Sequence, residues 1–95
     1  MNIGELKAGM SNVNIKAKIS ELRDPREVMT KFGTATTLIE VILEDDSGTV
    51  KLTLWGKQAD GLEKDQDIEV VGGFTKEFRE EVQLGLGRGG SIKVL

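Results

Sequence analysis

The chain has 95 residues and a mass of 10.4 kDa, which predicts one domain with a modest hydrophobic core. It contains no cysteine and no histidine, so disulfides, thiolate zinc sites and the commonest general base are excluded. The net charge of −3 excludes a binding mode that relies on overall positive charge, although residues 1–33 carry +2 (six basic, four acidic) and residues 76–95 carry +1 (four basic, three acidic).

The apolar runs along the chain are only a few residues long, too short for a membrane span. The first residues also lack the basic and apolar regions of a secretion signal. These features predict a cytoplasmic protein without a membrane partner, associated with the chromosome if its ligand is DNA.

The first strand is predicted to begin at Val13 and to include Ile19. Apolar and polar residues alternate there with the period of two that is typical of a half-buried strand. Pro25 breaks this pattern, because proline has no amide to donate to a sheet ladder. A long loop is predicted from there to Gly33.

Two further strands are predicted to form a hairpin. The first of them, about 34–45, is rich in Thr, Ile and Val, and an Asp-Asp-Ser-Gly turn follows it. In the next strand, 49–55, the apolar side chains share one face, whereas Lys51, Thr53 and Trp55 share the other.

The second half of the chain predicts one or two helical turns at 57–62 and a fourth strand at about 67–74. Val82, Leu84 and Leu86 then predict a fifth strand with these side chains facing inward. The glycines that follow are predicted to loosen the chain before a short C-terminal tail.

Five strands with a short helix between the third and the fourth predict an all-β, five-stranded Greek-key barrel of the oligonucleotide/oligosaccharide-binding (OB) type over residues 1–95. An SH3-like barrel is the alternative, but it usually lacks a helix at this point. In the OB fold the second and third strands, with the loops after the first and fourth, form the binding face.

Trp55 is the only tryptophan, and its phase with Lys51 and Thr53 favours a place on the wet face. An exposed indole can stack on any base, which contributes ~1–3 kcal/mol per base. A structural role, in which Trp55 covers the open end of the barrel, is the alternative.

Two phenylalanines flank the predicted connection between the fourth and fifth strands. Phe78 stands in a charged run without apolar neighbours, which favours a binding role. Phe74 shares its phase with Ile68 and Val70, so a regular strand would bury it. A bulge at the preceding Gly-Gly pair would instead turn it outward.

Phe32 is predicted at the tip of the first long loop, beside Lys31 and near Arg23 and Arg26. An aromatic ring among basic groups suits base stacking combined with backbone contacts, although a solvated tip without a role explains the pattern equally well.

Gln83 and Gly85 are predicted on the wet face of the fifth strand, where the glycine would let nucleic acid approach the backbone. Residues 85–90 match the dinucleotide pattern G-x-G-x-x-G, but only five residues follow, too few for the helix that this site requires. The acidic residues 44–46 lack the spacing of a calcium loop and are interpreted as a solvated turn.

The sequence resembles archaeal single-stranded DNA-binding proteins, which are related to the OB domains of replication protein A and to the B subunit of the sensor-of-single-stranded-DNA complex. The resemblance is carried by Val50-Lys-Leu-Thr-Leu-Trp-Gly-Lys57, by the Asp-Ser-Gly turn before it, and by Phe74, Phe78 and Val82-Gln-Leu84. It extends over about residues 3–88.

The resemblance implies that three aromatic residues stack on successive bases and that residues of the first long loop contact the nucleic-acid strand. The corresponding positions are Trp55, Phe74 and Phe78 for stacking, and Arg26, Thr30 and Lys31 in the loop. Two features depart from the family pattern. The second aromatic is Phe in this chain, whereas it is often Trp in the family, and Glu77, Glu80 and Glu81 make the loop beside it more acidic than expected.

We therefore predict a monomeric, non-catalytic single-stranded DNA-binding protein of replication, recombination or repair, with no cofactor or metal. No nucleophile–base pair can be assembled from its residues. The predicted contacts besides the three aromatics are Lys16, Lys18, Arg26, Thr30, Lys31, Phe32, Lys51, Thr53, Lys76, Arg79 and Gln83. Single-stranded RNA and a protein partner are the alternative ligands, and replication or repair proteins are expected as further partners.

Overall fold

The computed structural model describes residues 2–29, 31–59 and 61–95. The described residues form six strands and two single 3-10 turns. In chain order these are η1 (Ile3–Glu5), β1 (Val13–Leu22), β2 (Arg26–Met29), β3 (Ala35–Asp45), β4 (Gly48–Trp55), η2 (Gly56–Ala59), β5 (Asp67–Phe78) and β6 (Glu81–Val94). None of the helical segments in this part of the chain is long and apolar enough to cross a membrane.

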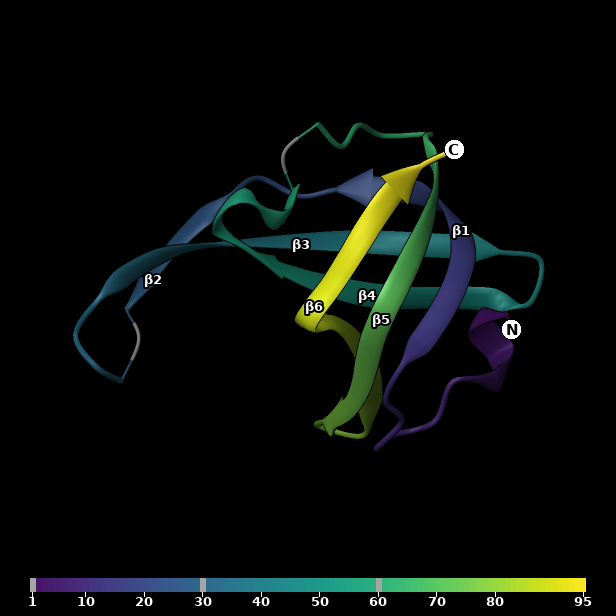
Figure 1. Ribbon diagram of the computed structural model, residues 1–95, viewed down its shortest axis with the longest axis horizontal. Coiled ribbons are helices and arrows are strands. Elements are labelled where there is room, and N and C mark those ends of the chain that lie inside the picture. The colour runs from purple at the N-terminus through teal and green to yellow at the C-terminus, as the bar shows by residue number, and fades with distance from the viewer. Residues whose placement is uncertain (1, 30, 60) are drawn as a thin grey trace.

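The strands form one sheet that closes on itself (Figure 1). The order across the sheet is β1-β5-β6-β4-β3-β2, and β1 also pairs with β3, so five strands close a ring and β2 extends it at one edge. β4 and β6 pair in parallel, whereas the remaining pairs are antiparallel. The predicted all-β barrel is thus confirmed, and the predicted short helix is the single turn η2.

The core lies inside this ring and is built from alternate residues of each strand. In β1, Val13, Ile15, Ala17 and Ile19 are buried, as their period of two predicts. Apolar residues of β3, β4 and β5, together with Leu84 of β6, pack against them. Because most inward positions are filled by Val, Ile and Leu, the side chains between them lie on the outer face of the ring.

β5 changes its phase halfway along. The register with β6 shifts between Val71 and Gly73, and Gly72 adopts a φ of +72°, a conformation that favours glycine. Beyond this bulge Gly73 and Thr75 point inward, so Phe74 turns to the outer face. The bulge that the Gly-Gly pair suggested is confirmed, and a fully regular β5 is excluded.

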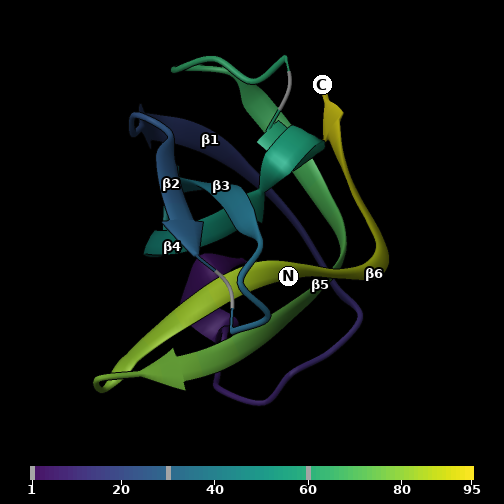
Figure 2. The same ribbon diagram turned by 90° about the vertical axis from the view of Figure 1, so that its left-hand side faces the viewer.

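The long loop predicted after Pro25 is only partly a loop. Residues 26–29 form β2, which pairs with β3 from Arg26↔Leu38 to Met29↔Ala35. The effect of Pro25 is local, and the start of β3 offers an edge to which the chain can return as a strand. β2 and β3 therefore project from the barrel as a hairpin, on the left in Figure 1. In Figure 2 this side of the molecule faces the viewer.

β6 is longer than predicted, because its glycines bend the strand instead of ending it. After pairing with β4 and with the end of β5, the chain pairs again with β5, from Val71↔Ser91 to Ile68↔Val94. A Cβ at Gly72 would lie 3.2 Å from the Cα of Gly90, so these two glycines allow a close backbone approach.

The N-terminal segment is tied to the barrel at two places. The amide of Ile3 donates to Asp45 Oδ2 (2.8 Å) and the amide of Gly4 donates to Ser47 Oγ (2.7 Å). These two hydrogen bonds fix η1 against the β3–β4 turn. Thr75, buried by the bulge, accepts from the amide of Met10 (2.8 Å).

Candidate nucleic-acid interface

A groove of about 240 Å³ lies on the outer face of β3, β4, β5 and β6. The pairing of the strands explains how its walls meet, because Lys51 of β4 lies in register with Gln83 of β6, which in turn lies opposite Lys76 of β5. The residues that line the groove are Leu38, Glu40, Lys51, Thr53, Trp55, Lys76, Phe78 and Gln83.

Two aromatic rings line this groove and remain open to solvent. Trp55, at the end of β4, is 45% exposed, and Phe78, at the end of β5, is 56% exposed. The amide of Trp55 donates to Gln58 Oε1 (2.8 Å), which ties the residue to the η2 turn. Their exposed faces favour stacking over the alternative in which Trp55 covers the end of the barrel.

Phe74 lies on the same outer face but is half-buried, and its ring rests on the backbone of Gly85. A Cβ at position 85 would come within 2.9 Å of the Phe74 Cζ atom. The expectation that nucleic acid approaches the backbone at Gly85 is therefore wrong, since the ring of Phe74 fills that space. Only part of the Phe74 ring is left for a ligand.

A two-residue turn, Arg79 and Glu80, carries the chain from β5 to β6. Both residues adopt positive φ (52° and 66°), and Phe78 pairs with Glu81 across the turn, which is the pattern of a type I′ hairpin. The guanidinium carbon of Arg79 lies 5.2 Å from the centre of the Phe78 ring, within cation–π range. Most of the connection predicted between the fourth and fifth strands is thus part of β5 and β6. The tight turn between them holds Phe78 at a fixed place on the rim of the groove.

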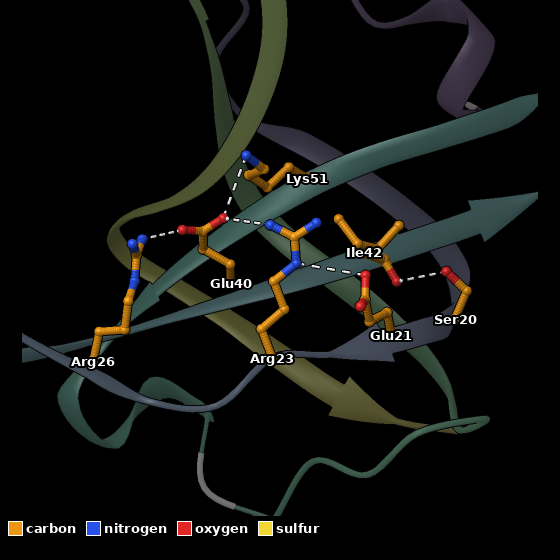
Figure 3. A network of polar contacts seen from close by, with 7 residues as sticks. All are labelled: Ser20, Glu21, Arg23, Arg26, Glu40, Ile42 and Lys51. Atoms are coloured by element: carbon orange, nitrogen blue, oxygen red, sulfur yellow. Dashed lines mark hydrogen bonds and ion pairs between the residues drawn. The ribbon is translucent and has the colours of Figure 1, made fainter.

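Glu40, which was not among the residues predicted from the sequence, holds three basic side chains at the groove (Figure 3). Arg23 Nη1 lies 3.2 Å and Lys51 Nζ 3.3 Å from Oε2, and Arg26 pairs with Oε1. Desolvation acts to raise the pKa of Glu40, but the hydrogen bond and charge of Lys51 and the charges of Arg26 and Arg23 outweigh it, so this pKa is lowered. The sequence showed only its alternation with the apolar residues of β3, and its place opposite Thr53 follows from the pairing with β4.

The tip of the β2–β3 hairpin carries Lys31 and Phe32, which are not among the groove-lining residues. Phe32 is 83% exposed, and Lys31 Nζ lies 5.3 Å from the centre of its ring. Thr30 lies outside the described residues. Arg26 belongs to β2 and reaches the groove through its ion pair with Glu40.

The sequence is 38% identical over 85 residues to the single-stranded DNA binding protein Ssb of Saccharolobus solfataricus, and the match covers 90% of this chain. The chain spans 57% of the length of that relative. The predicted resemblance to archaeal single-stranded DNA-binding proteins is thereby confirmed. No protein-family model matches the sequence.

Solved structures share the fold of this chain. The second OB-fold domain of replication protein A from Methanococcus maripaludis is similar with a TM-score of 0.82 and 28% identity, covering 100% of this chain and 95% of that one. The chain is an OB-fold domain. The replication factor A related protein from Methanobacterium thermoautotrophicum shares the fold with a TM-score of 0.83 at 20% identity, over 100% of this chain and 89% of that one.

A second hollow of the OB-fold domain, about 470 Å³ in volume, contains Lys16 and Lys18. These two lysines share it with four carboxylates, those of Glu44, Asp45, Asp46 and Asp67. They lie apart from the groove, so the structure does not bring them together with the other predicted contacts. Acidic surroundings of this kind disfavour a phosphate.

Apart from Lys16 and Lys18, the predicted residues that the structure describes divide into three groups. Trp55 and Phe78 line the groove with Lys51, Thr53, Lys76 and Gln83. Around it lie Phe74 on the same face, Arg79 in the turn and Arg26 at Glu40. Lys31 and Phe32 lie at the hairpin tip. A nucleic-acid strand would contact them only if it extended beyond the groove.

Proposed function

We propose that this domain binds single-stranded DNA in the groove, without catalysing a reaction, during replication, recombination or repair. The observation that carries the proposal is the placement of two exposed rings, Trp55 and Phe78, with two lysines, Lys51 and Lys76, along one groove. The relative named as a single-stranded DNA binding protein supports the same ligand.

In this proposal the bases bind chiefly by stacking. Each stacked base contributes ~1–3 kcal/mol, and any base can stack, so binding tolerates different sequences. The partly covered ring of Phe74 offers an edge and a smaller face between the two open rings. One OB fold covers ~4–16 nucleotides, and three aromatic positions favour the lower end of this range.

Charge has a smaller part in the proposal than in most nucleic-acid-binding proteins. The chain carries 13 basic and 16 acidic residues, and three of its cations are held by Glu40. With two to four phosphates neutralised, the logarithm of affinity should fall with the logarithm of salt concentration at a slope of roughly −1.4 to −2.8. The proposal thus predicts binding that survives moderate salt.

The proposal is tested by titrating the protein with oligothymidylate while the fluorescence of Trp55, the only indole, is recorded. Stacking of a base on Trp55 should quench its emission until the groove is saturated. Duplex DNA of equal length should bind far more weakly, because its bases are already stacked on each other. Equal affinity for duplex, or binding without quenching, would contradict the proposal.

The same titration with oligouridylate tests the alternative ligand. Stacking does not distinguish ribose from deoxyribose, so a preference for RNA requires a contact to the 2′-hydroxyl. We propose DNA as the ligand and a monomer as the binding unit, acting on chromosomal DNA in the cytoplasm. Tighter binding of oligouridylate than of oligothymidylate would reverse the first of these assignments.

A further inference from the structure

Glu40 occupies an unexpected place for an acidic residue, because it lines the groove that is proposed to receive a polyanion. Its side chain is only 13% exposed, and it stands on β3 directly opposite Thr53 of β4. An acidic side chain at the rim would merely repel phosphates. One inside the groove, surrounded by cations, instead changes which of these cations a phosphate can reach.

The three cations come from separate segments and meet at this carboxylate. Arg23 follows β1, Arg26 belongs to β2 and Lys51 to β4, and both carboxylate oxygens are engaged (Figure 3). Glu21 adds a weaker contact to Arg23 at 3.5 Å. The ion pairs thus hold the base of the β2–β3 hairpin against the barrel.

A carboxylate and a backbone phosphate offer the same chemistry to these cations. Each presents two oxygens that share a negative charge, and arginine binds both groups through the same pair of N–H donors. A phosphate that approaches the groove must therefore share Arg23, Arg26 or Lys51 with Glu40, or displace it from them.

We propose that Glu40 is an internal competitor of the DNA phosphates, which keeps the three cations together in the empty groove and lowers the affinity of the domain for single-stranded DNA. This inference rests on the proposed function. Its consequence is that stacking on Trp55 and Phe78 decides most of the affinity, and that a bound strand is released more readily than the number of nearby cations implies.

Glu40→Gln tests the proposal, because glutamine keeps the shape of the side chain and removes its charge. Each cation that is freed should add ~0.7 to the steepness of the salt dependence. Glu40→Gln should therefore bind oligothymidylate more tightly than the unmodified protein at low salt, with a gain that shrinks about fivefold per freed cation over a tenfold rise in salt.

Glu44→Gln is the matched control, since it removes the same charge from the same outer face of β3, four residues away. The two variants are compared at about 0.1 M salt, where the screening length is ~10 Å. Glu44 lies ~13 Å along the strand, so its effect at this concentration should stay below about twofold. Equal gains in the two variants, an unchanged affinity in Glu40→Gln, or weaker binding by it would overturn the proposal.

A second comparison leaves Glu40 in place, so it does not depend on whether Glu40→Gln folds. Lys51 is paired with Glu40, whereas Lys76 lines the same groove and takes part in no ion pair among the described residues. Lys76→Gln should flatten the salt dependence by ~0.7, and Lys51→Gln by clearly less. Equal flattening would overturn the proposal.

The outcomes also separate this inference from the proposed function. If oligothymidylate fails to quench Trp55 in the unmodified protein, the proposed function is wrong and no competitor is needed. If quenching is strong but Glu40→Gln behaves like Glu44→Gln, only the role of Glu40 is wrong.

Discussion

The groove and the acidic hollow differ in a way that their sizes do not predict. The hollow, at about 470 Å³, is the larger of the two, and it contains Lys16 and Lys18. The groove, at about 240 Å³, also contains two lysines, but it adds Trp55 and Phe78. In the hollow the lysines face four carboxylates, whereas in the groove they face one.

If the groove is the DNA site that we propose, volume and lysine content are poor guides to a polyanion site. What distinguishes the groove is an exposed aromatic ring at each end and a positive local balance. The hollow instead contains Asp45, whose carboxylate binds the amides of Ile3 and Ser47 and so has a structural role. Variants on the two surfaces can test this distinction directly.

Truncating an aromatic ring of the groove should have the largest effect. Phe78→Ala is expected to lose ~1–3 kcal/mol of binding free energy, because it removes one stacking surface and no charge. Its salt dependence should therefore remain nearly unchanged. Binding is followed by the quenching of Trp55, which this variant retains.

Two controls belong to this measurement. Replacing Lys16 and Lys18 together by Gln removes charge from the hollow and should leave binding nearly unchanged. The unfolding midpoint of Phe78→Ala should also be preserved, since a core phenylalanine would cost ~3–5 kcal/mol of stability on truncation. A stable Phe78→Ala protein with full affinity would remove Phe78 from the site.

β1 and β5 show how far the sequence alone could predict this structure. β1 alternates without interruption, so its buried residues could be assigned from Val13 onward. In β5 the same rule would bury Phe74, and only the bulge at Gly72 turns that ring outward. The Gly-Gly pair indicated that a bulge was possible, but a bulge depends on pairing with β6, which local sequence does not specify.

The features that could not be predicted depend on contacts between distant segments. β2 exists because β3 extends beyond the barrel and offers an edge. The cluster at Glu40 joins residues of β2, β3 and β4 with Arg23 of the β1–β2 connection, and each of them alone has the pattern of a solvated charge. By contrast, Trp55 and Phe78 could be predicted, because a large apolar ring among polar residues is conspicuous at the level of sequence.

Asp45→Asn should have the next largest effect, on stability rather than on binding. Asp45 accepts from Ser47 on one oxygen and from Ile3 on the other, so an amide nitrogen there would face a donor and cost about 1 kcal/mol. Asp46→Asn, which changes an exposed neighbour by the same charge, is the control. Thermal unfolding at neutral pH should rank Asp45→Asn below both Asp46→Asn and the unmodified protein.

The pH dependence gives a second readout of this role. The hydrogen bond from the Ser47 side chain, opposed by desolvation and helped by the amides of Ile3, Ser47 and Gly48, holds the pKa of Asp45 below its ordinary value of 3.8. A lowered pKa contributes stability above the unfolded pKa, and this contribution is lost as pH falls through the folded pKa. The stabilities of the unmodified protein and Asp45→Asn should therefore converge below pH 3.8.

The smallest effect is expected in the turn that holds Phe78 at the rim of the groove. Glu80 adopts a φ of 66°, which costs a side-chain-bearing residue ~1–2 kcal/mol, whereas glycine adopts it freely. Because glycine also loses ~0.5–1 kcal/mol through the entropy of the unfolded chain, Glu80→Gly should stabilise the protein by only about 0.5 kcal/mol. Glu80→Gln, which removes the charge but keeps the strained backbone, should give no such gain in chemical unfolding. If both variants stabilise equally, repulsion among the glutamates of this loop limits stability, and the turn geometry does not.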